Sequence, residues 1–315
     1  MYQNMEKFAE RRAKMRIVIA GGTGFIGRKL TDMLLREGHE VVILTRKDKQ
    51  PANRVQYVKW LVEDASPENE IGNADVFINL AGVSINDGRW SAKHQKQIYE
   101  SRMCATDEML RILSAMPRKP AVLVNASAIG IYPPSRNAVY TEKSLQRAND
   151  FLGRTVSDWE AKAKQAEKHA IRTVLLRFGV VLGKENGALP LMVLPYKWFA
   201  GGTVGSGNQW VSWVHITDVV RSILFAIKNE NIRGPVNVTA PSPITMKAFG
   251  KTIGAVLHRP HWLPVPSFAL KLALGQKSSL VLEGQHVRPE VLMQAGFEFM
   301  FPTLRQALED LLTNP

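Results

Sequence analysis

The stretch Arg16-Ile17-Val18-Ile19-Ala20-Gly21-Gly22-Thr23-Gly24-Phe25-Ile26-Gly27 decides the fold. Apolar residues run into a glycine cluster, and an amphipathic segment over 25–36 follows, which predicts a buried strand, a tight turn and a helix. In the G-x-x-G-x-x-G spacing, Gly21 permits the sharp exit from the strand. Gly24 lets a pyrophosphate approach the helix amides, and Gly27 lets helix and strand pack closely. The stretch predicts a dinucleotide-binding turn; an ordinary strand-to-helix loop is the alternative.

Strands and helices alternate over residues 15–182, which predicts an α/β protein with a Rossmann-type doubly wound parallel sheet. Further strands are expected at 40–45, 55–60, 75–82, 121–125 and 172–181, and helices at 91–115 and 151–169. Residues 183–315, rich in glycine and then in proline, are expected to form a smaller C-terminal substrate or lid region. A strand near 236–238 would return to the sheet. Residues 1–14 are expected to be an N-terminal extension, disordered or a frayed helix.

The end of the second predicted strand distinguishes the two nicotinamide cofactors. An acidic residue at this point would bind the ribose 2′-hydroxyl of NAD. Here the strand ends at Thr45 and is followed by Arg46 and Lys47, whose cations suit a 2′-phosphate. The sequence therefore favours NADP (NADPH) over NAD, with a solvated basic turn as the alternative.

Composition limits the partners. The chain has 315 residues, a net charge of +13 and one cysteine, Cys104, so an intramolecular disulfide and a cysteine metal cluster are excluded. Cys104 is expected to be partly buried in a helix. The positive charge favours phosphate-bearing small molecules. We expect no nucleic-acid partner, because the basic residues are scattered, and no membrane partner, because no apolar run reaches the length of a span. A cytoplasmic protein is expected, with a homodimer as one possible assembly and no metal site.

In combination, several motifs resemble those of an extended short-chain dehydrogenase/reductase, and more narrowly the poorly characterised "epimerase family" branch whose members are often labelled sugar-nucleotide epimerases or cell-division inhibitors. The resemblance covers residues 15–315. It rests on the glycine turn and on the segments Asn79–Gly82, Arg177–Gly183, Gly205–Trp210 and Trp213–Asp218.

The resemblance implies a bound nicotinamide dinucleotide. Its predicted contacts are Gly21, Thr23, Gly24, Phe25, Ile26, Gly27, Thr45, Arg46, Lys47, Leu80, Ala81, Gly82, Arg102 and Val181. Arg102 would reach the cofactor phosphates or ribose, with a solvated helix charge as the alternative. Val181 would lie beside the nicotinamide, with a core valine as the alternative. The C-terminal region would hold a small-molecule substrate.

The resemblance also implies hydride chemistry with a Ser-Tyr-Lys set, in which the tyrosine exchanges a proton and the serine orients the substrate oxygen. Ser127 fits the serine position, or else it bonds its own loop. If Glu160 is the glutamate expected further along the helix, the lysine and tyrosine positions hold Val156 and Leu152, which transfer no proton. Tyr132, five residues beyond the strand, is the substitute donor, with a packing aromatic as the alternative.

Four aromatic residues offer a second feature. Trp90, Trp210, Trp213 and His215 could line a substrate cavity, with core packing as the alternative. Two functions remain open. The chain is an NADP-dependent oxidoreductase or epimerase with a non-standard proton donor, or it is a non-catalytic NADP-binding sensor or regulatory protein.

Overall fold

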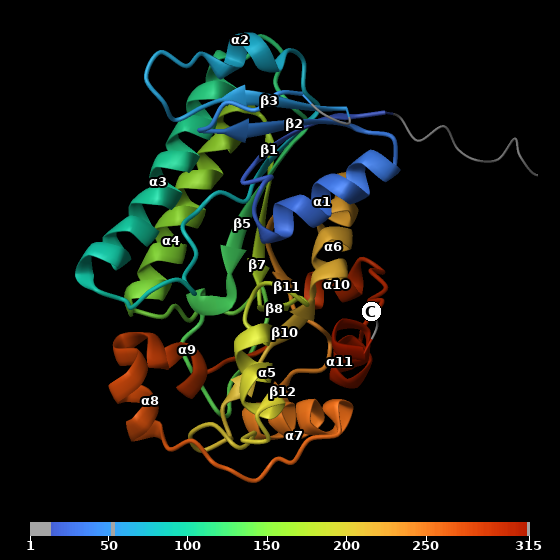
Figure 1. Ribbon diagram of the computed structural model, residues 1–315. Helices are drawn as coiled ribbons and strands as arrows, with labels where there is room; N and C mark the ends of the chain where they lie inside the picture. Colours follow the sequence, from blue (N-terminus) through green and yellow to red (C-terminus); the bar gives the residue numbers. More distant parts are fainter. Residues whose placement is uncertain (1–13, 52–53, 314–315) are drawn as a thin grey trace, which may run out of the picture.

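The computed structural model describes residues 14–51 and 54–313. The extension predicted at residues 1–14 lies outside this range except for Lys14. The centre of the molecule is a seven-stranded parallel sheet in the order β11-β7-β5-β4-β1-β2-β3 (Figure 1). Its strands are β1 Arg16–Ala20, β2 Glu40–Thr45, β3 Val55–Lys59, β4 Val76–Asn79, β5 Val122–Ala128, β7 Arg172–Phe178 and β11 Gly234–Val238.

The strand order reverses beside β1, because β2 pairs with one of its edges and β4 with the other. In doubly wound sheets, ligands bind outside the carboxyl ends of the strands at this switch point. The turn after Ala20 and the loop after Asn79 both start there. The topology therefore confirms the predicted fold class, and a dinucleotide is expected at this switch point.

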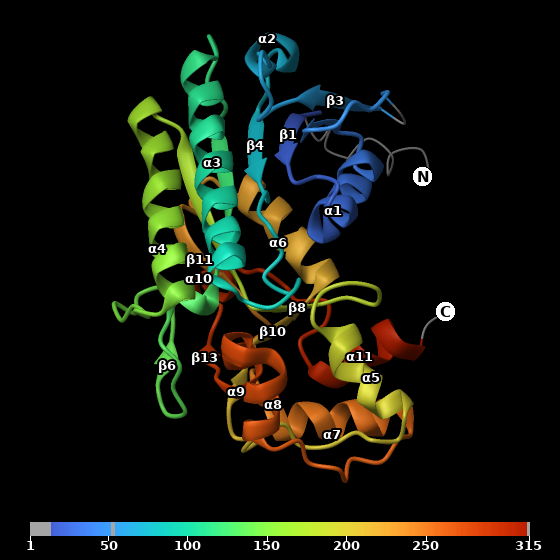
Figure 2. The same ribbon diagram turned by 60° about the vertical axis from the view of Figure 1, so that its left-hand side comes forward.

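Helices cover both faces of the sheet (Figures 1 and 2). One face is covered by α3 (Ala92–Ala115) and α4 (Phe151–Ala163), the other by α1 (Phe25–Arg36) and α6 (Ile216–Lys228). The short helix α2 (Pro67–Ile71) lies before β4. The helix α6, which has a strongly apolar buried face, was not among the predicted helices.

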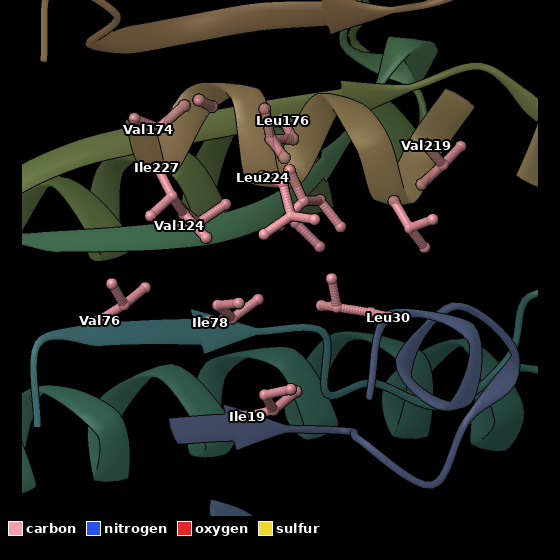
Figure 3. Packing of buried hydrophobic residues seen from close by; sticks show 14 of the residues in the cluster. Ile19, Leu30, Val76, Ile78, Val124, Val174, Leu176, Val219, Leu224 and Ile227 are labelled. Carbon is pink, nitrogen blue, oxygen red and sulfur yellow. The ribbon is translucent and has the colours of Figure 1, made fainter. Parts of the chain in front are cut away.

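Side chains alternate along the central strands and feed two cores. Ile17 and Ile19 face α1 and α6, whereas Val18 and Ala20 face α3. Figure 3 shows the first core, in which strand residues such as Ile19, Ile78 and Val124 meet Leu30 of α1 and Leu224 of α6. Because the central strands are covered on both faces, they are continuous apolar runs.

The remaining elements lie beyond the carboxyl ends of the strands, apart from α10 and η3. They are β6 Val139–Tyr140, β8 Val180–Leu182, β9 Trp210–Val211, β10 Trp213–His215, β12 Ile244–Thr245, β13 His286–Val287, α5 Leu189–Lys197, α7 Met246–Leu257, α8 Ser267–Leu274, α9 Ser279–Leu282, α10 Glu290–Gln294, α11 Leu304–Thr313, and the 3-10 turns η2 Ile129–Ile131, η3 Lys164–His169 and η4 Gly275–Ser278. The division predicted at residue 182 stays a prediction. β11 and α6, both later in the sequence, belong to the sheet and its covering layer.

Four local expectations differ from the structure. The strand expected over 75–82 ends at Asn79, where the chain enters a loop. The strand expected over 172–181 is interrupted at Gly179, because Val180 leaves the sheet, donates to the Ser212 carbonyl and starts a parallel pair with β10. A Cβ at Gly179 would lie 2.3 Å from the Ser212 oxygen, so only glycine fits. The α-helix expected over 151–169 ends at Ala163 and continues as η3. Cys104 is exposed on α3, so its expected burial is wrong.

Candidate cofactor site

The glycine turn between β1 and α1 has space for backbone only. Gly21 has φ +79°, and a Cβ there would lie 2.7 Å from the Leu80 carbonyl. A Cβ on Gly27 would lie 2.2 Å from the Gly21 oxygen. At the helix start, Gly24 provides no side-chain cap and the first turn has no acid. The first amides of α1 lack intrahelical partners, which makes this end of the helix a fit for a pyrophosphate.

The loop after β4 is held in a fixed shape next to that turn. Buried Asn79 donates from Nδ2 to Thr106 Oγ1 (3.2 Å) and to Asn125 Oδ1 (2.8 Å). Its Oδ1 accepts from the Ala81 amide (3.2 Å). Leu80 and Ala81 are both partly exposed. The predicted contacts Leu80 and Ala81 therefore border the glycine turn on a rigid support.

Arg102 reaches this loop from α3. Its Nη1 donates to the Val83 carbonyl (3.1 Å) and to the Ile98 carbonyl (2.9 Å), and Cζ lies 5.1 Å from the Trp159 ring. A Cβ on Gly82 would be 3.2 Å from Cζ, so Gly82 makes room for the guanidinium. Burial lowers the pKa of Arg102 to about 10, which leaves it charged at neutral pH. No carboxylate within the described part of the chain pairs with Arg102, so it is a cation available to an anionic ligand.

The end of β2 carries a second group of cations. Arg46 and Lys47 are exposed, and neither forms an ion pair with another described residue. The neighbouring acid, Asp48, is paired with Lys59 of β3 at 2.8 Å. A shallow cavity of about 200 Å³ opens here, lined by Thr45, Lys47, Asp48, Lys49, Tyr57, Lys59 and Glu70. The arrangement is rich in cations and suits a phosphate group.

Phe25, Ile26 and Val181 connect the turn to the neighbouring segments. The Phe25 ring packs on the loop after β8, where a Cβ on Gly183 would lie 2.4 Å from it. Ile26 and Val181 are partly buried and pack against the first core. Thr23 is exposed beside the turn. The contacts predicted for these residues stay predictions, and their positions around the switch point are compatible with them.

A buried polar network occupies the carboxyl end of β5, where the serine was predicted. The Ser127 hydroxyl donates to Glu160 Oε1 at 2.6 Å. Arg177 of β7 donates from Nε and Nη2 to the two Glu160 oxygens, at 2.7 and 2.8 Å. The exposed fractions are 3% for Ser127, 6% for Glu160 and 2% for Arg177. Glu160 therefore neutralises Arg177 in the interior, a pairing that our sequence analysis missed; an arginine within an apolar strand was the available signal.

Tyr132 lies inside the same network. Arg177 Nη1 donates to its hydroxyl at 2.7 Å, and that hydroxyl lies 2.9 Å from Asn237 Oδ1 and 3.0 Å from the Thr141 carbonyl. The side chain is fully buried, and burial raises the pKa of Tyr132. This geometry argues against the substitute-donor hypothesis, because the hydroxyl is enclosed by protein and already hydrogen-bonded to Arg177, Asn237 and Thr141. The packing alternative describes Tyr132.

The helix α4 offers no replacement for the tyrosine and lysine that the resemblance implies. Val156 is buried in a small apolar cluster with Tyr132 and Tyr140. Leu152 faces Gly130, where a Cβ would lie 3.6 Å from the Leu152 Cβ. Both positions therefore serve packing.

The four residues proposed for a substrate cavity are not brought together as a cavity lining. Trp90, Trp213 and His215 are buried, at 8%, 0% and 1% exposure. The Trp210 ring lies 4.4 Å from the His286 ring at an interplanar angle of 42°, and the Trp210 indole donates to the Arg136 carbonyl. Core packing, the alternative, describes Trp90, Trp213 and His215. Among the described residues, no three His, Cys, Asp or Glu side chains gather into a metal site.

The fold and the glycine turn define an α/β protein built to hold a dinucleotide. The sequence matches the family model "NAD dependent epimerase/dehydratase family" over residues 17–239 and a domain of unknown function, DUF1731, over 265–311. The chain belongs to the NAD dependent epimerase/dehydratase family. This finding confirms the resemblance on which the sequence analysis relied.

Proteins described as epimerase family proteins or sugar-nucleotide epimerases are similar to most of the chain. Epimerase family protein YfhF of Bacillus subtilis (strain 168) is 48% identical over 95% of this chain and 99% of its own length. Human epimerase family protein SDR39U1 (isoform 2), in a crystal structure with NADPH, is 32% identical with a TM-score of 0.85, covering 96% of this chain and all of that one. A nucleoside-diphosphate sugar epimerase from Corynebacterium glutamicum has 27% identity and a TM-score of 0.76, covering 95% of this chain and 58% of that one.

Proposed function

We propose that this chain binds NADPH in preference to NADH, with the 2′-phosphate at the end of β2. The observation that carries the proposal is the exposed guanidinium of Arg46 beside Lys47, which pairs with no carboxylate among the described residues and lies where NAD-binding sheets place an acid. Asp48 is paired with Lys59 and does not neutralise Arg46. The human relative, whose structure is described with NADPH, supports the same cofactor.

The other groups of the site each have a role in this proposal. The first amides of α1 and the cation of Arg102 would hold the pyrophosphate. Leu80 and Ala81 would border the adenosine half, and Val181 the nicotinamide half. When bound, the cofactor supplies a hydride donor or acceptor.

The test compares the affinities of Arg46→Ala for the two cofactors by calorimetric titration. A charged hydrogen bond contributes about 1.5–3 kcal/mol, so NADPH affinity should fall about 10- to 100-fold, and NADH affinity should barely change. Arg36→Ala, an exposed arginine at the far end of α1, is the matched control and should alter neither affinity. Equal losses for NADPH and NADH in Arg46→Ala would contradict the 2′-phosphate assignment.

We further propose that the bound cofactor serves a sensing or regulatory role rather than the epimerase reaction. Epimerisation needs a group that takes and returns the proton of a substrate hydroxyl. Leu152 and Val156 occupy the positions expected for that group, and Tyr132 is enclosed by protein.

One observation favours a second candidate, an NADPH-dependent reductase or alcohol oxidoreductase. The Ser127 hydroxyl donates a hydrogen bond to Glu160, so its oxygen keeps lone pairs that would accept from a substrate hydroxyl, and Ser127 retains 3% exposure whereas Tyr132 has none. In alcohol oxidation the hydroxyl proton of the substrate would pass to the Ser127 oxygen as the Ser127 proton passes to the Glu160 carboxylate, and the hydride from the substrate carbon would be taken up by NADP⁺. Carbonyl reduction would run the same transfer backwards.

Absorbance of NADPH in the presence of a panel of aldehydes, ketones and sugar nucleotides separates the two candidates. The sensing role predicts no oxidation above the rate without protein, in wild type and in Ser127→Ala alike. The oxidoreductase predicts turnover that Ser127→Ala abolishes while NADPH affinity stays the same. Turnover that survives in Ser127→Ala would contradict both assignments.

A further inference from the structure

The end of the molecule opposite α2 carries an unusual set of exposed aromatic residues. Both views place α7, the segment 258–266 and α8 at this end (Figures 1 and 2). Trp198 is 77% exposed, Phe199 54%, Trp262 67% and Leu263 45%. The cofactor proposal uses none of them. We call these four residues the aromatic patch.

The aromatic patch is one surface built from two adjoining segments. The amides of Trp262 and Leu263 both donate to the Gly201 carbonyl, and the Trp262 indole donates to the Phe199 carbonyl at 2.9 Å. Phe199 has φ +58°, a left-handed conformation that is strained for a large side chain. The fold therefore holds these side chains outward in fixed positions at some conformational cost.

Neighbouring helices extend the apolar surface. On α5, Leu191 and Leu194 are 63% and 50% exposed and precede Trp198 by seven and four residues, so the three share one helix face. The helix α8 follows the segment that carries Trp262, contains no buried residue, and exposes Phe268 at 74% and Leu272 at 84%. Exposed apolar surface of this extent marks an interaction site.

The segments that carry the aromatic patch and its neighbouring helices have positively charged side chains only. Residues 186–217 and 239–282 contain no Asp or Glu, and their Lys and Arg residues are Lys197, Lys247, Lys251, Arg259, Lys271 and Lys277. Arg259 lies 4.4 Å from the Phe199 ring centroid, and Lys197 is exposed next to Trp198. The helix α11, which packs against α7, brings Glu309 and Asp310, but these face Arg305 and His215.

We propose that this end of the molecule docks on an anionic lipid surface. Trp and Phe settle at the headgroup level of a bilayer, and Lys and Arg attract its anionic lipids. A second copy of the chain fits poorly, because a two-fold contact would bring two acid-free, cationic surfaces together. No helix of the described residues is long and apolar enough to cross a membrane, so the docking would be peripheral. This proposal replaces the sequence-based expectation of no membrane partner, which considered only spanning segments, and it does not depend on the cofactor.

The test is co-sedimentation of the full chain with vesicles of phosphatidylcholine alone, and with vesicles of equal parts phosphatidylcholine and phosphatidylglycerol. We expect binding to the anionic vesicles, weakened by salt, and little binding to the neutral ones. Trp198 and Trp262 are the most exposed tryptophans, so their emission should shift to the blue on binding, and Trp198→Phe/Trp262→Phe should lose the shift but still bind.

Two double variants test the two halves of the surface. Trp198→Ser/Trp262→Ser should abolish vesicle binding. Each surface cation contributes about fivefold, so Lys197→Gln/Arg259→Gln should weaken binding about 30-fold. The matched controls are Leu145→Ser, an 87% exposed leucine before α4, and Lys93→Gln/Lys96→Gln on α3, which should bind like wild type. Circular dichroism checks that every variant is folded.

Three results would overturn the proposal. The first is equal sedimentation of Trp198→Ser/Trp262→Ser and wild type. The second is no binding to either the neutral or the anionic vesicles, which would favour an acidic protein as the partner of the aromatic patch. The third is a dimer in solution that Trp198→Ser/Trp262→Ser dissociates, which would assign the aromatic patch to a second copy.

Discussion

Replacing Glu160 with glutamine should destabilise the protein severely, although the two side chains have the same shape. The carboxylate accepts from Ser127 and from two donors of Arg177, and both members of the ion pair are nearly inaccessible to solvent. Glutamine replaces one acceptor oxygen with an NH₂ group that faces an arginine donor, and it leaves the Arg177 charge buried without a counter-ion.

Removing one partner of a buried pair costs about 3–5 kcal/mol. At about 2 °C for each kcal/mol in a chain of this size, the midpoint of thermal unfolding should fall by about 6–10 °C. Thermal unfolding followed by circular dichroism at neutral pH measures the shift, and urea unfolding measures the free energy. The double variant Glu160→Gln/Arg177→Met should recover much of the loss, because it removes the stranded charge as well.

The pair of Lys96 and Glu100 on the surface of α3 provides the matched control. Its atoms are 3.6 Å apart and its side chains are 73% and 53% exposed. Glu100→Gln should cost less than about 0.5 kcal/mol, because water screens the pair. If Glu160→Gln shifts the midpoint no more than Glu100→Gln does, the buried ion pair does not stabilise the fold as we argue.

Three further outcomes follow from the structure. Gly27→Ala should cost at least about 1–3 kcal/mol of stability and abolish NADPH binding, because its Cβ would meet the Gly21 oxygen at 2.2 Å. Gly24→Ala should cost less stability, because its nearest contact is 3.2 Å. If calorimetry shows Gly24→Ala to be the more destabilising variant, the turn geometry is contradicted. Tyr132→Phe should cost about 1–3 kcal/mol of stability, because Arg177 and Asn237 each lose a hydrogen-bond partner. NADPH affinity and any NADPH oxidation should stay unchanged. A variant that keeps wild-type stability but no longer oxidises NADPH would show that Tyr132 is a proton donor. Burial lowers the pKa of His215, so the unfolded chain takes up the proton at a higher pH than the native protein, and the stability is full above about pH 6.5 and falls below it. His215→Asn keeps an acceptor for the Thr217 amide at the start of α6 but removes the titrating group. In urea unfolding, this variant should lose less stability than wild type when the pH falls from about 7.5 to about 5.5. Equal losses in the variant and in wild type would refute the assignment to His215.

The sequence predicted the parts of the site that are made of backbone. Gly21 and Gly27 have conformational and steric requirements that only glycine meets, so their spacing between an apolar run and a helix identified the turn. The position of Arg46 and Lys47 at the end of β2 was predictable for a similar reason, because a strand end and the two residues after it are adjacent in the chain. The mostly apolar strands, covered on both sides, were recognisable as a parallel sheet for the same reason.

The structure decided everything that depends on which side chains meet. The buried network joins side chains from separate segments: Ser127 from the end of β5 and Tyr132 from just after it, Glu160 from α4, Arg177 from β7 and Asn237 from β11. The order of these strands and the packing of α4 on the sheet bring them together. Within that network Tyr132 is a buried, hydrogen-bonded side chain, which argues against its predicted role as a proton donor. Trp198 and Trp262 likewise become one surface only because residues 199–205 run beside 262–265. By itself the sequence determined that a dinucleotide-binding turn forms, because the turn is local; what surrounds the cofactor, and which surface faces outward, follows from long-range packing that no spacing along the chain encodes.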